Sequence, residues 1–207
     1  MKRLSRLDRR ICRRLAIFRK TAADLPLLDT RGADILASFL SIEATNLWAE
    51  FTRTYVMFGL SGSVTAGGHR IRTRFPSGTP LDVALAQMPQ VLKRPTPTPT
   101  RRDEPPWHSR GEFLRTITLA NFTNIAQITA ALSLPSTAID HLPTVRNFYA
   151  HRNEDTVFKV RRLALRYALP RFNHPTDFLR TRIPGRPATV FEEWLAELEA
   201  VISAMCA

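Results

Sequence analysis

The chain contains few cysteines and no paired histidines. Its two cysteines, Cys12 and Cys206, lie at opposite ends of 207 residues. Two such distant thiols form neither a disulfide framework nor a metal cluster, and they fit a reducing compartment. None of the five histidines belongs to an HxxxH or HExxH pair, which argues against a dedicated metal site. We therefore expect a cytoplasmic protein that uses no metal and no other cofactor.

Long apolar runs are also missing. No stretch approaches the roughly 20 residues that a membrane-spanning helix needs, and the basic N-terminus lacks the continuous apolar segment of a secretory signal. No membrane partner is expected. The sustained two-residue alternation of strands is absent as well, whereas apolar residues recur at helical spacings. The sequence therefore predicts an all-α fold.

Acidic residues are scarce relative to basic ones. The 30 Lys and Arg face 18 Asp and Glu, which leaves a net charge of +12, and most of the excess is Arg. Such a surface attracts polyanions, and contacts with phosphate groups are the usual source of this attraction. A high-GC genome that favours Arg codons would give a similar composition. The charge nevertheless favours a nucleic-acid partner.

The first 28 residues predict a basic amphipathic helix, followed by a domain over residues 29–207. Apolar side chains recur there at steps of three and four, with arginines between them: Leu4, Leu7, Ile11, Leu15 and Phe18. Such a stripe packs on the body of a protein, lies on a membrane surface or contacts RNA. Packing is the simplest of the three interpretations.

The domain is expected to begin with a long core helix over residues 33–60 that closes at Gly59. Its predicted apolar face comprises Ile35, Phe39, Ile42, Leu47, Phe51 and Tyr55. A Pro- and Gly-rich insertion follows at about 61–108, with a short helix from Thr79 to about Lys93 that Pro89 bends or breaks. Its length is unusual for a structural connection, which leaves a lid, a partner-binding arm or a simple insertion as alternatives.

The second half of the domain is expected to be helical again. We predict helices over 109–132, from about Pro143, from a break and N-cap at 153–156 to Ala168, and over 189–205. The three tryptophans, Trp48, Trp107 and Trp194, are expected in the core, where such side chains usually lie.

Residues 146–151, Arg-Asn-Phe-Tyr-Ala-His, combine side chains suited to phosphodiester chemistry. Arg146 carries a permanent, forked positive charge that can hold a phosphate. His151 can exchange a proton near neutral pH. Asn147 lies four residues before His151, so it shares a helical face with it and can orient the imidazole. These three residues are the candidate catalytic group.

The spacing within this group carries geometric information. Five helical residues rotate by about 500°, which leaves Arg146 and His151 roughly 140° apart. The two side chains therefore converge only if the helix ends or distorts at His151, or if a second copy of the motif completes the cleft across a twofold dimer.

The motif resembles the Rx4-6H signature of the HEPN superfamily, including the polar residue that commonly follows its Arg. The resemblance is firm over about residues 110–170 and extends plausibly to the helix over 33–59. It implies a HEPN-like helical bundle that forms a dimer, in which the motifs of the two protomers face each other and make one composite site. It also implies a metal-independent ribonuclease that leaves a 2′,3′-cyclic phosphate, of the toxin–antitoxin or anti-phage defence type. An antitoxin or a defence protein would then be a further partner.

The same groups suggest a mechanism. His151 would take the proton of a ribose 2′-OH, Arg146 would stabilise the anionic phosphorane, and the second protomer's His would protonate the departing 5′ oxygen to leave a 5′-OH end. We expect single-stranded RNA to approach along Arg152, Arg161 and Arg162, although a solvated helix face explains them equally well. Three polar residues at steps of three and seven on the long helix could contact the motif: Glu43, Asn46 and Arg53.

Two other functions remain open. Some HEPN proteins have lost catalysis and act as RNA-binding or dimerisation modules. A helix-turn-helix DNA-binding regulator is the other alternative, because residues 125–133 and 136–151 mimic its two helices with Pro135 in the turn. That turn often contains a Gly, which is missing here.

Overall fold

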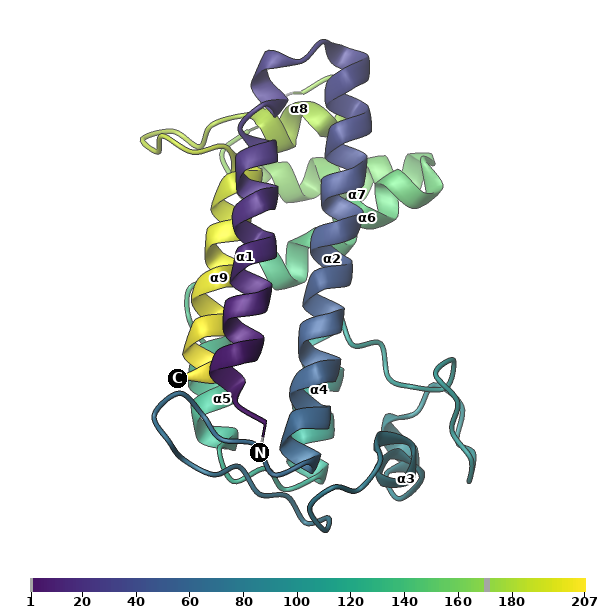
Figure 1. Ribbon diagram of the computed structural model, residues 1–207. Helices are drawn as coiled ribbons and strands as arrows, with labels where there is room; N and C mark the ends of the chain where they lie inside the picture. The colour runs from purple at the N-terminus through teal and green to yellow at the C-terminus, as the bar shows by residue number, and fades with distance from the viewer. Residues whose placement is uncertain (1, 170–171) are drawn as a thin grey trace. The chain divides into compact units, whose positions relative to one another are not determined.

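The computed structural model describes residues 2–169 and 172–207; Met1, where the predicted N-terminal helix starts, lies outside them. The described chain is helical and contains no β-strand, which confirms the all-α prediction. No helix of this described part has the length and apolarity needed to cross a membrane. The helices in Figure 1 are α1 Leu4–Ala22, α2 Thr30–Leu60, α3 Leu81–Ala86, α4 Arg110–Leu119, α5 Ile125–Leu132, α6 Ala138–His151, α7 Glu154–Leu165, α8 Pro175–Arg180 and α9 Val190–Cys206.

The chain folds into two compact units. Unit 1 holds the N-terminal segment up to Cys12, Leu47–Leu134 and Ala200–Ala207, whereas unit 2 holds Arg13–Asn46 and Pro135–Glu199. Helices α3, α4 and α5 therefore belong to unit 1, and α6, α7 and α8 to unit 2. The predicted division into residues 1–28 and 29–207, and the HEPN-like character of the bundle, stay predictions.

The apolar stripe of α1 is buried along its whole length. Leu4, Leu7, Ile11, Leu15 and Phe18 are each at most 9% exposed, while the arginines between them are exposed or half-buried. Burying an amphipathic stripe of this kind is the main source of stability for a helix in a globular protein. The packing interpretation of this segment is confirmed. The helix ends at Ala22, and a short 3-10 turn, Leu25–Leu27, follows.

The long helix α2 is confirmed, but the first half of its predicted apolar face is wrong. Ile35 and Phe39 are 62% and 54% exposed. The side chains that are buried instead are mostly small: Ala33, Ala37, Leu40 and Ala44. Alanines allow neighbouring backbone to approach closely. The prediction counted only large apolar residues, so its apolar face points away from the side of α2 that is buried.

Gly59 lies one residue before the end of α2, close to the predicted position. A β-carbon there would overlap Cε1 and Cζ of the Phe122 ring, which is fully buried in unit 1. Since α2 continues to Leu60, Gly59 does not terminate the helix. Packing against Phe122 accounts for the glycine.

The insertion at 61–108 is a packed part of unit 1. It buries a set of apolar side chains that includes Ile71, Phe75, Leu85, Met88, Val91 and Trp107. Glu104 is 7% exposed and accepts hydrogen bonds from Arg53 Nε at 2.6 Å, Arg53 Nη2 at 2.7 Å and Trp107 Nε1 at 2.7 Å. The predicted break at Pro89 is confirmed, because α3 ends at Ala86 and a 3-10 turn begins at Pro89.

The single helix predicted over 109–132 is wrong. It is divided into α4 and α5 by a loop in which Asn121 has a φ of 52°, a conformation that Asn tolerates better than most residues. The loop pairs with the insertion: Arg74 N–H donates to the Ala120 carbonyl at 2.9 Å and Thr123 N–H to the Arg72 carbonyl at 3.0 Å. These distant partners compensate for the helical bonds lost at the break.

Helix α6 begins five residues earlier than predicted, with Pro143 inside it. Glu197 of α9 caps its N-terminus: its Oε2 accepts from the backbone N–H groups of Thr137 at 2.7 Å and Ala138 at 2.9 Å. A carboxylate at this position satisfies the first free N–H groups and complements the helix dipole. The predicted break at 153–156 is confirmed as a capping box between Asn153 and Thr156 that starts α7.

Candidate functional site

The candidate motif forms the last two turns of α6 in unit 2. The buried face of these turns carries Val145, Phe148 and Tyr149. Burial raises the pKa of Tyr149 far above its ordinary value, against a smaller opposing effect of its hydrogen bond with Thr176, so this phenol is neutral. The other side of the helix presents Asn147 and His151 to solvent, with Arg146 half-buried. The sequence thus folds with its aromatic residues as anchors and its polar residues outward.

Arg146 and His151 leave the helix in different directions. Because α6 is continuous through His151, five residues of helix separate the two side chains by roughly 140°. Arg146 Nη1 donates to Asn147 Oδ1 at 3.2 Å. Asn147 is thus bound to the arginine of the motif, and its predicted role in orienting the imidazole of His151 stays a prediction. The helix does end at His151, as predicted.

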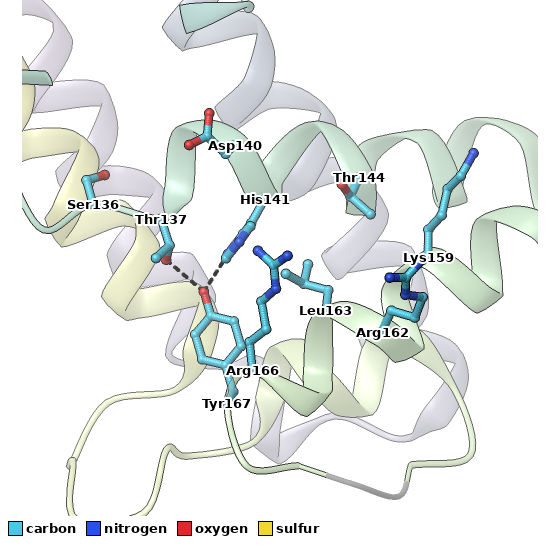
Figure 2. Close-up of a pocket in the computed structure, with 10 residues that line it drawn as sticks. All are labelled: Ser136, Thr137, Asp140, His141, Thr144, Lys159, Arg162, Leu163, Arg166 and Tyr167. Carbon is cyan, nitrogen blue, oxygen red and sulfur yellow. Dashed lines mark hydrogen bonds between the residues drawn. The ribbon is translucent and has the colours of Figure 1, made fainter. Parts of the chain in front are cut away.

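A pocket of about 660 Å³ lies between α6 and α7 in unit 2 (Figure 2). Lys159, Arg162 and Arg166 line it from α7 and its C-cap, and Thr137, His141 and Thr144 from the start and middle of α6. The site residues predicted from the sequence did not include His141, Lys159, Arg166 or Tyr167. The available signal was the spacing of 159, 162 and 166 at steps of three and four, which places three cations on one side of α7.

Tyr167 joins several of the residues that line this pocket. Its Oη lies 2.8 Å from Thr137 Oγ1, 2.8 Å from His141 Nδ1 and 2.7 Å from Trp194 Nε1. Burial lowers the pKa of His141, and the positive charge of Arg166 lowers it further. Burial also raises the pKa of Tyr167. Both rings are therefore neutral at physiological pH, and the pocket's charge comes from its Lys and Arg.

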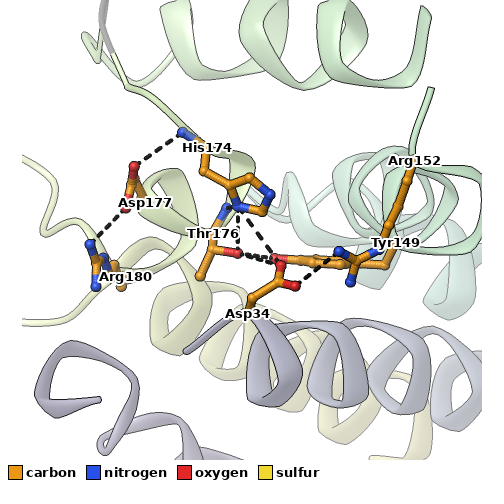
Figure 3. A network of polar contacts seen from close by, with 7 residues as sticks. All are labelled: Asp34, Tyr149, Arg152, His174, Thr176, Asp177 and Arg180. Atoms are coloured by element: carbon orange, nitrogen blue, oxygen red, sulfur yellow. Dashed lines mark hydrogen bonds and ion pairs between the residues drawn. The ribbon is translucent and has the colours of Figure 1, made fainter. Parts of the chain in front are cut away.

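A second polar network holds the C-terminal end of α6 (Figure 3). Arg152 has φ 45° and ψ 44°, and its N–H donates to the Phe148 carbonyl at 2.7 Å, which is a left-handed helix cap. Its Nη1 donates to Asp34 Oδ2 of α2 at 2.9 Å. Thr176 donates its hydroxyl to Asp34 Oδ1 at 3.1 Å and lies 2.9 Å from Tyr149 Oη.

His174 completes this network from the N-cap of α8. Its Nδ1 accepts from Thr176 N–H at 3.2 Å and lies 3.8 Å from Asp34 Oδ1. The network thus fixes Tyr149, two residues before His151, and Arg152, directly after it, through contacts with α2 and α8. The site residues predicted from the sequence did not include Asp34, His174 or Thr176. Asp34 lies more than 100 residues from Arg152 and Thr176, and Thr176 lies 27 residues from Tyr149, so no local pattern indicates these contacts.

The three predicted RNA-binding arginines occupy different positions. Arg152 is paired with Asp34. Arg162 lines the α6–α7 pocket and its guanidinium lies 5.9 Å from the Phe158 ring centroid. Arg161 is exposed. It precedes Arg162 by one residue, so its side chain leaves the helix about 100° away from that of Arg162, and it does not line the pocket. The structure therefore places one of the three in the pocket and leaves the other two elsewhere.

The polar residues predicted to contact the motif from α2 have other partners. Glu43 Oε2 lies 3.9 Å from Arg14 Nη2, and its Oε1 accepts from Asn46 Nδ2 at 3.2 Å. Arg53 is held by Glu104, and that hydrogen bond raises its pKa most strongly. Arg53 belongs to unit 1, whereas the motif belongs to unit 2. A common helical face is thus a weak guide to what these side chains contact.

No family model, curated protein sequence or solved structure matches this chain. The resemblance to HEPN proteins accordingly depends on residues 146–151 and their helical context. Within residues 2–169 and 172–207, no group of three or more His, Cys, Asp and Glu side chains is placed to hold a metal ion.

Proposed function

We propose that this chain is a HEPN-type endoribonuclease that cleaves single-stranded RNA through Arg146 and His151. One observation carries the proposal: both side chains stand on the last two turns of a helix whose aromatic residues are buried and whose end is fixed by the left-handed cap at Arg152 and by the Asp34 network. Such support pre-organises the functional groups, which is what a catalytic site requires.

The divergence of the two side chains supports a composite site. An Arg and a His that leave one helix roughly 140° apart cannot both face the same phosphate from a single protomer without distortion. A twofold axis beside the exposed face of α6 would bring two copies of the motif together. In that arrangement His151 of one protomer and its twin supply the base and the acid that cleavage needs.

The reaction begins with removal of the 2′-OH proton by a neutral imidazole. The 2′ oxygen attacks the adjacent phosphorus, Arg146 stabilises the charge that develops on the phosphorane, and the second imidazole protonates the 5′ oxygen as the P–O bond breaks. The products are a 2′,3′-cyclic phosphate and a 5′-OH. Every proton transfer in this scheme uses a protein side chain.

Cleavage is tested with single-stranded RNA in the presence of EDTA. The wild-type protein should cut, whereas His151→Ala and Arg146→Ala should lose activity by at least about 10²-fold, as expected for a general base and an oxyanion-stabilising cation. A matched control is Arg182→Ala, an exposed arginine of unit 2 outside the motif and outside the predicted RNA-binding residues. Equally strong cleavage by folded His151→Ala protein would refute the assignment.

The composite site makes a separate prediction about mixtures. His151→Ala protein added in excess to wild type should lower the wild-type activity, because mixed dimers contain one imidazole instead of two. Activity per protomer should also fall when the protein is diluted below its dimer dissociation constant. Activity that is independent of both treatments would contradict the dimer and leave the nuclease assignment standing.

The same assay separates the two alternative functions. RNA bound but uncut would indicate a non-catalytic RNA-binding or dimerisation module, and duplex DNA bound without cleavage would indicate a DNA-binding regulator. For the regulator, the two required helices α5 and α6 fall in different compact units, which gives that alternative no support. A role as a toxin or anti-phage effector, restrained by an antitoxin or defence partner, predicts growth arrest with RNA damage on expression.

A further inference from the structure

The pocket between α6 and α7 combines concentrated positive charge with room for a ligand. Lys159, Arg162 and Arg166 contribute three positive charges and Asp140 one negative charge. Lys159 is partly neutralised by Asp155 at 2.6 Å, in a largely exposed pair. Within residues 2–169 and 172–207, neither Arg162 nor Arg166 forms an ion pair, and Asp140 is the one acidic side chain in the pocket lining. This arrangement favours an anionic ligand with several oxygens.

The neutral end of the pocket suits the remainder of such a ligand. His141, Tyr167 and Thr137 form a hydrogen-bonded group, and Trp194 Nε1 donates to Tyr167 Oη in it. Figure 2 shows the guanidinium of Arg166 beside His141, with Lys159 and Arg162 toward the Thr144 end. Leu163 lines the pocket between these two regions. Hydroxyl groups, two neutral rings and one apolar side chain thus adjoin the cations.

The size of the pocket distinguishes between anions. About 660 Å³ lies in the range of roughly 300–1,000 Å³ that small-molecule sites occupy. An inorganic phosphate would fill only a small part of it, whereas a nucleotide carries a phosphate for the arginines, a ribose for the hydroxyls and a base for the ring-lined end. Nucleotide bases commonly stack on aromatic or imidazole rings.

We propose that the α6–α7 pocket is a nucleotide-binding site, in which Arg162 and Arg166 hold the phosphate and the His141–Tyr167 end receives the ribose and base. The bound unit is either one nucleotide of an RNA strand or a free mononucleotide. Binding in this pocket does not depend on cleavage at Arg146 and His151, so the binding site and the nuclease assignment are tested independently.

The position of the pocket favours the RNA strand as the source. Asp140 and Thr144 line the pocket, and Asn147 and His151 follow them on α6 at steps of three and four. Those spacings place all four on one face of the helix. A strand with one nucleotide in the pocket would therefore continue along α6 toward His151.

The experiment measures binding with ligands that cannot be cut. A 2′-O-methyl oligoribonucleotide, adenosine 5′-monophosphate and inorganic phosphate are titrated separately at about 0.15 M salt, with wild type, Arg162→Gln, Arg166→Gln and Arg182→Gln. Arg182 is the matched control, because it is an exposed arginine of unit 2 that lies outside the pocket lining and outside the predicted RNA-binding residues. Melting temperatures establish that all variants are folded.

We expect Arg162→Gln and Arg166→Gln each to weaken nucleotide or oligonucleotide binding at least tenfold, and Arg182→Gln to change it less than twofold. For the oligonucleotide, the slope of log affinity against log salt should fall by about one for each pocket arginine removed. If the oligonucleotide binds and the monophosphate does not, the bound unit belongs to an RNA strand. If the monophosphate binds and displaces the oligonucleotide, the bound unit is a free nucleotide.

Three results would overturn the proposal. The first is equal weakening by Arg182→Gln and Arg162→Gln, which would indicate general attraction of polyanions. The second is the absence of binding by either nucleotide ligand. The third is binding that inorganic phosphate matches in affinity, which would leave no role for the ribose and base.

Discussion

Asp34 of α2 and Arg152, the residue that follows His151, form an ion pair of 2.9 Å within unit 2. The same carboxylate accepts the Thr176 hydroxyl at 3.1 Å. One side chain from the N-terminal half of the chain therefore holds the end of the motif helix and the start of α8 together. Helix α2 therefore contacts the end of the motif helix through Asp34. The predicted contacts were through Glu43, Asn46 and Arg53 instead.

Replacing Asp34 should separate its two contacts. Asp34→Ala leaves the 3% exposed Thr176 without this acceptor, which should lower the free energy of unfolding by about 1–3 kcal/mol. Asp34→Asn keeps an oxygen for Thr176 and loses only the charge facing half-exposed Arg152, a contribution of about 0–1 kcal/mol. Urea denaturation of the three proteins measures the difference. Equal losses in both variants would show that the Thr176 bond contributes nothing.

Arg152→Gly should leave stability nearly unchanged. The left-handed conformation at 152, with φ 45°, costs a non-glycine residue about 1 kcal/mol, and glycine relieves that cost. The relief offsets the lost ion pair with Asp34, worth about 0–1 kcal/mol. The variant thus removes the guanidinium while keeping the turn after His151, and thermal unfolding checks it. Arg152→Ala should be less stable than Arg152→Gly.

The same pair of variants tests the predicted RNA contact of Arg152. If the guanidinium binds RNA, Arg152→Gly should weaken RNA affinity and reduce the salt dependence of binding. If it only holds Asp34, affinity should stay at the wild-type value.

Local signals in the sequence predicted the features that depend on neighbouring residues. The capping box of Asn153 and Thr156, the stripe of α1 and the end of α6 at His151 are set by residues within one or two turns of each other. The exposed motif and its divergent side chains also follow from helical geometry alone. These are the parts of the candidate site that one sequence can give.

Features that depend on distant partners escaped prediction. Helix α6 starts at Ala138 because Glu197, some 60 residues later, caps it, and α4 ends because its loop pairs with residues 72–74. Arg53 shares a helical face with Asn46, yet it is bound by Glu104 from the insertion. No periodicity in a single sequence encodes such pairings. The α6–α7 pocket was missed for the same reason, since it needs two helices placed side by side.

Glu104 should be among the most sensitive positions of unit 1. It is nearly buried and accepts three hydrogen bonds, two from Arg53 and one from Trp107. Glu104→Ala leaves the half-buried Arg53 guanidinium and the buried Trp107 indole N–H without their acceptor, which should cost about 1–3 kcal/mol. Replacing both partners, as Glu104→Leu with Arg53→Met, should cost less than Glu104→Ala alone. Chemical denaturation measures both. A double variant that is less stable than the single one would contradict this account.

His141 should make the stability of unit 2 depend on pH in one direction. Burial, with Arg166 beside it, lowers the pKa of His141 below its ordinary 6.5, so the unfolded chain takes up a proton there more readily than the folded one. The free energy of unfolding therefore receives its full contribution above about pH 6.5 and loses it progressively as the pH falls toward the lowered pKa of the folded state. His141→Gln removes this titration and can still hydrogen-bond Tyr167. Between pH 7 and pH 5 the melting temperature of wild type should fall more steeply than that of His141→Gln. Parallel curves would show that His141 is protonated equally well in both states, and that its surroundings are more open to water than its hydrogen bond with Tyr167 implies.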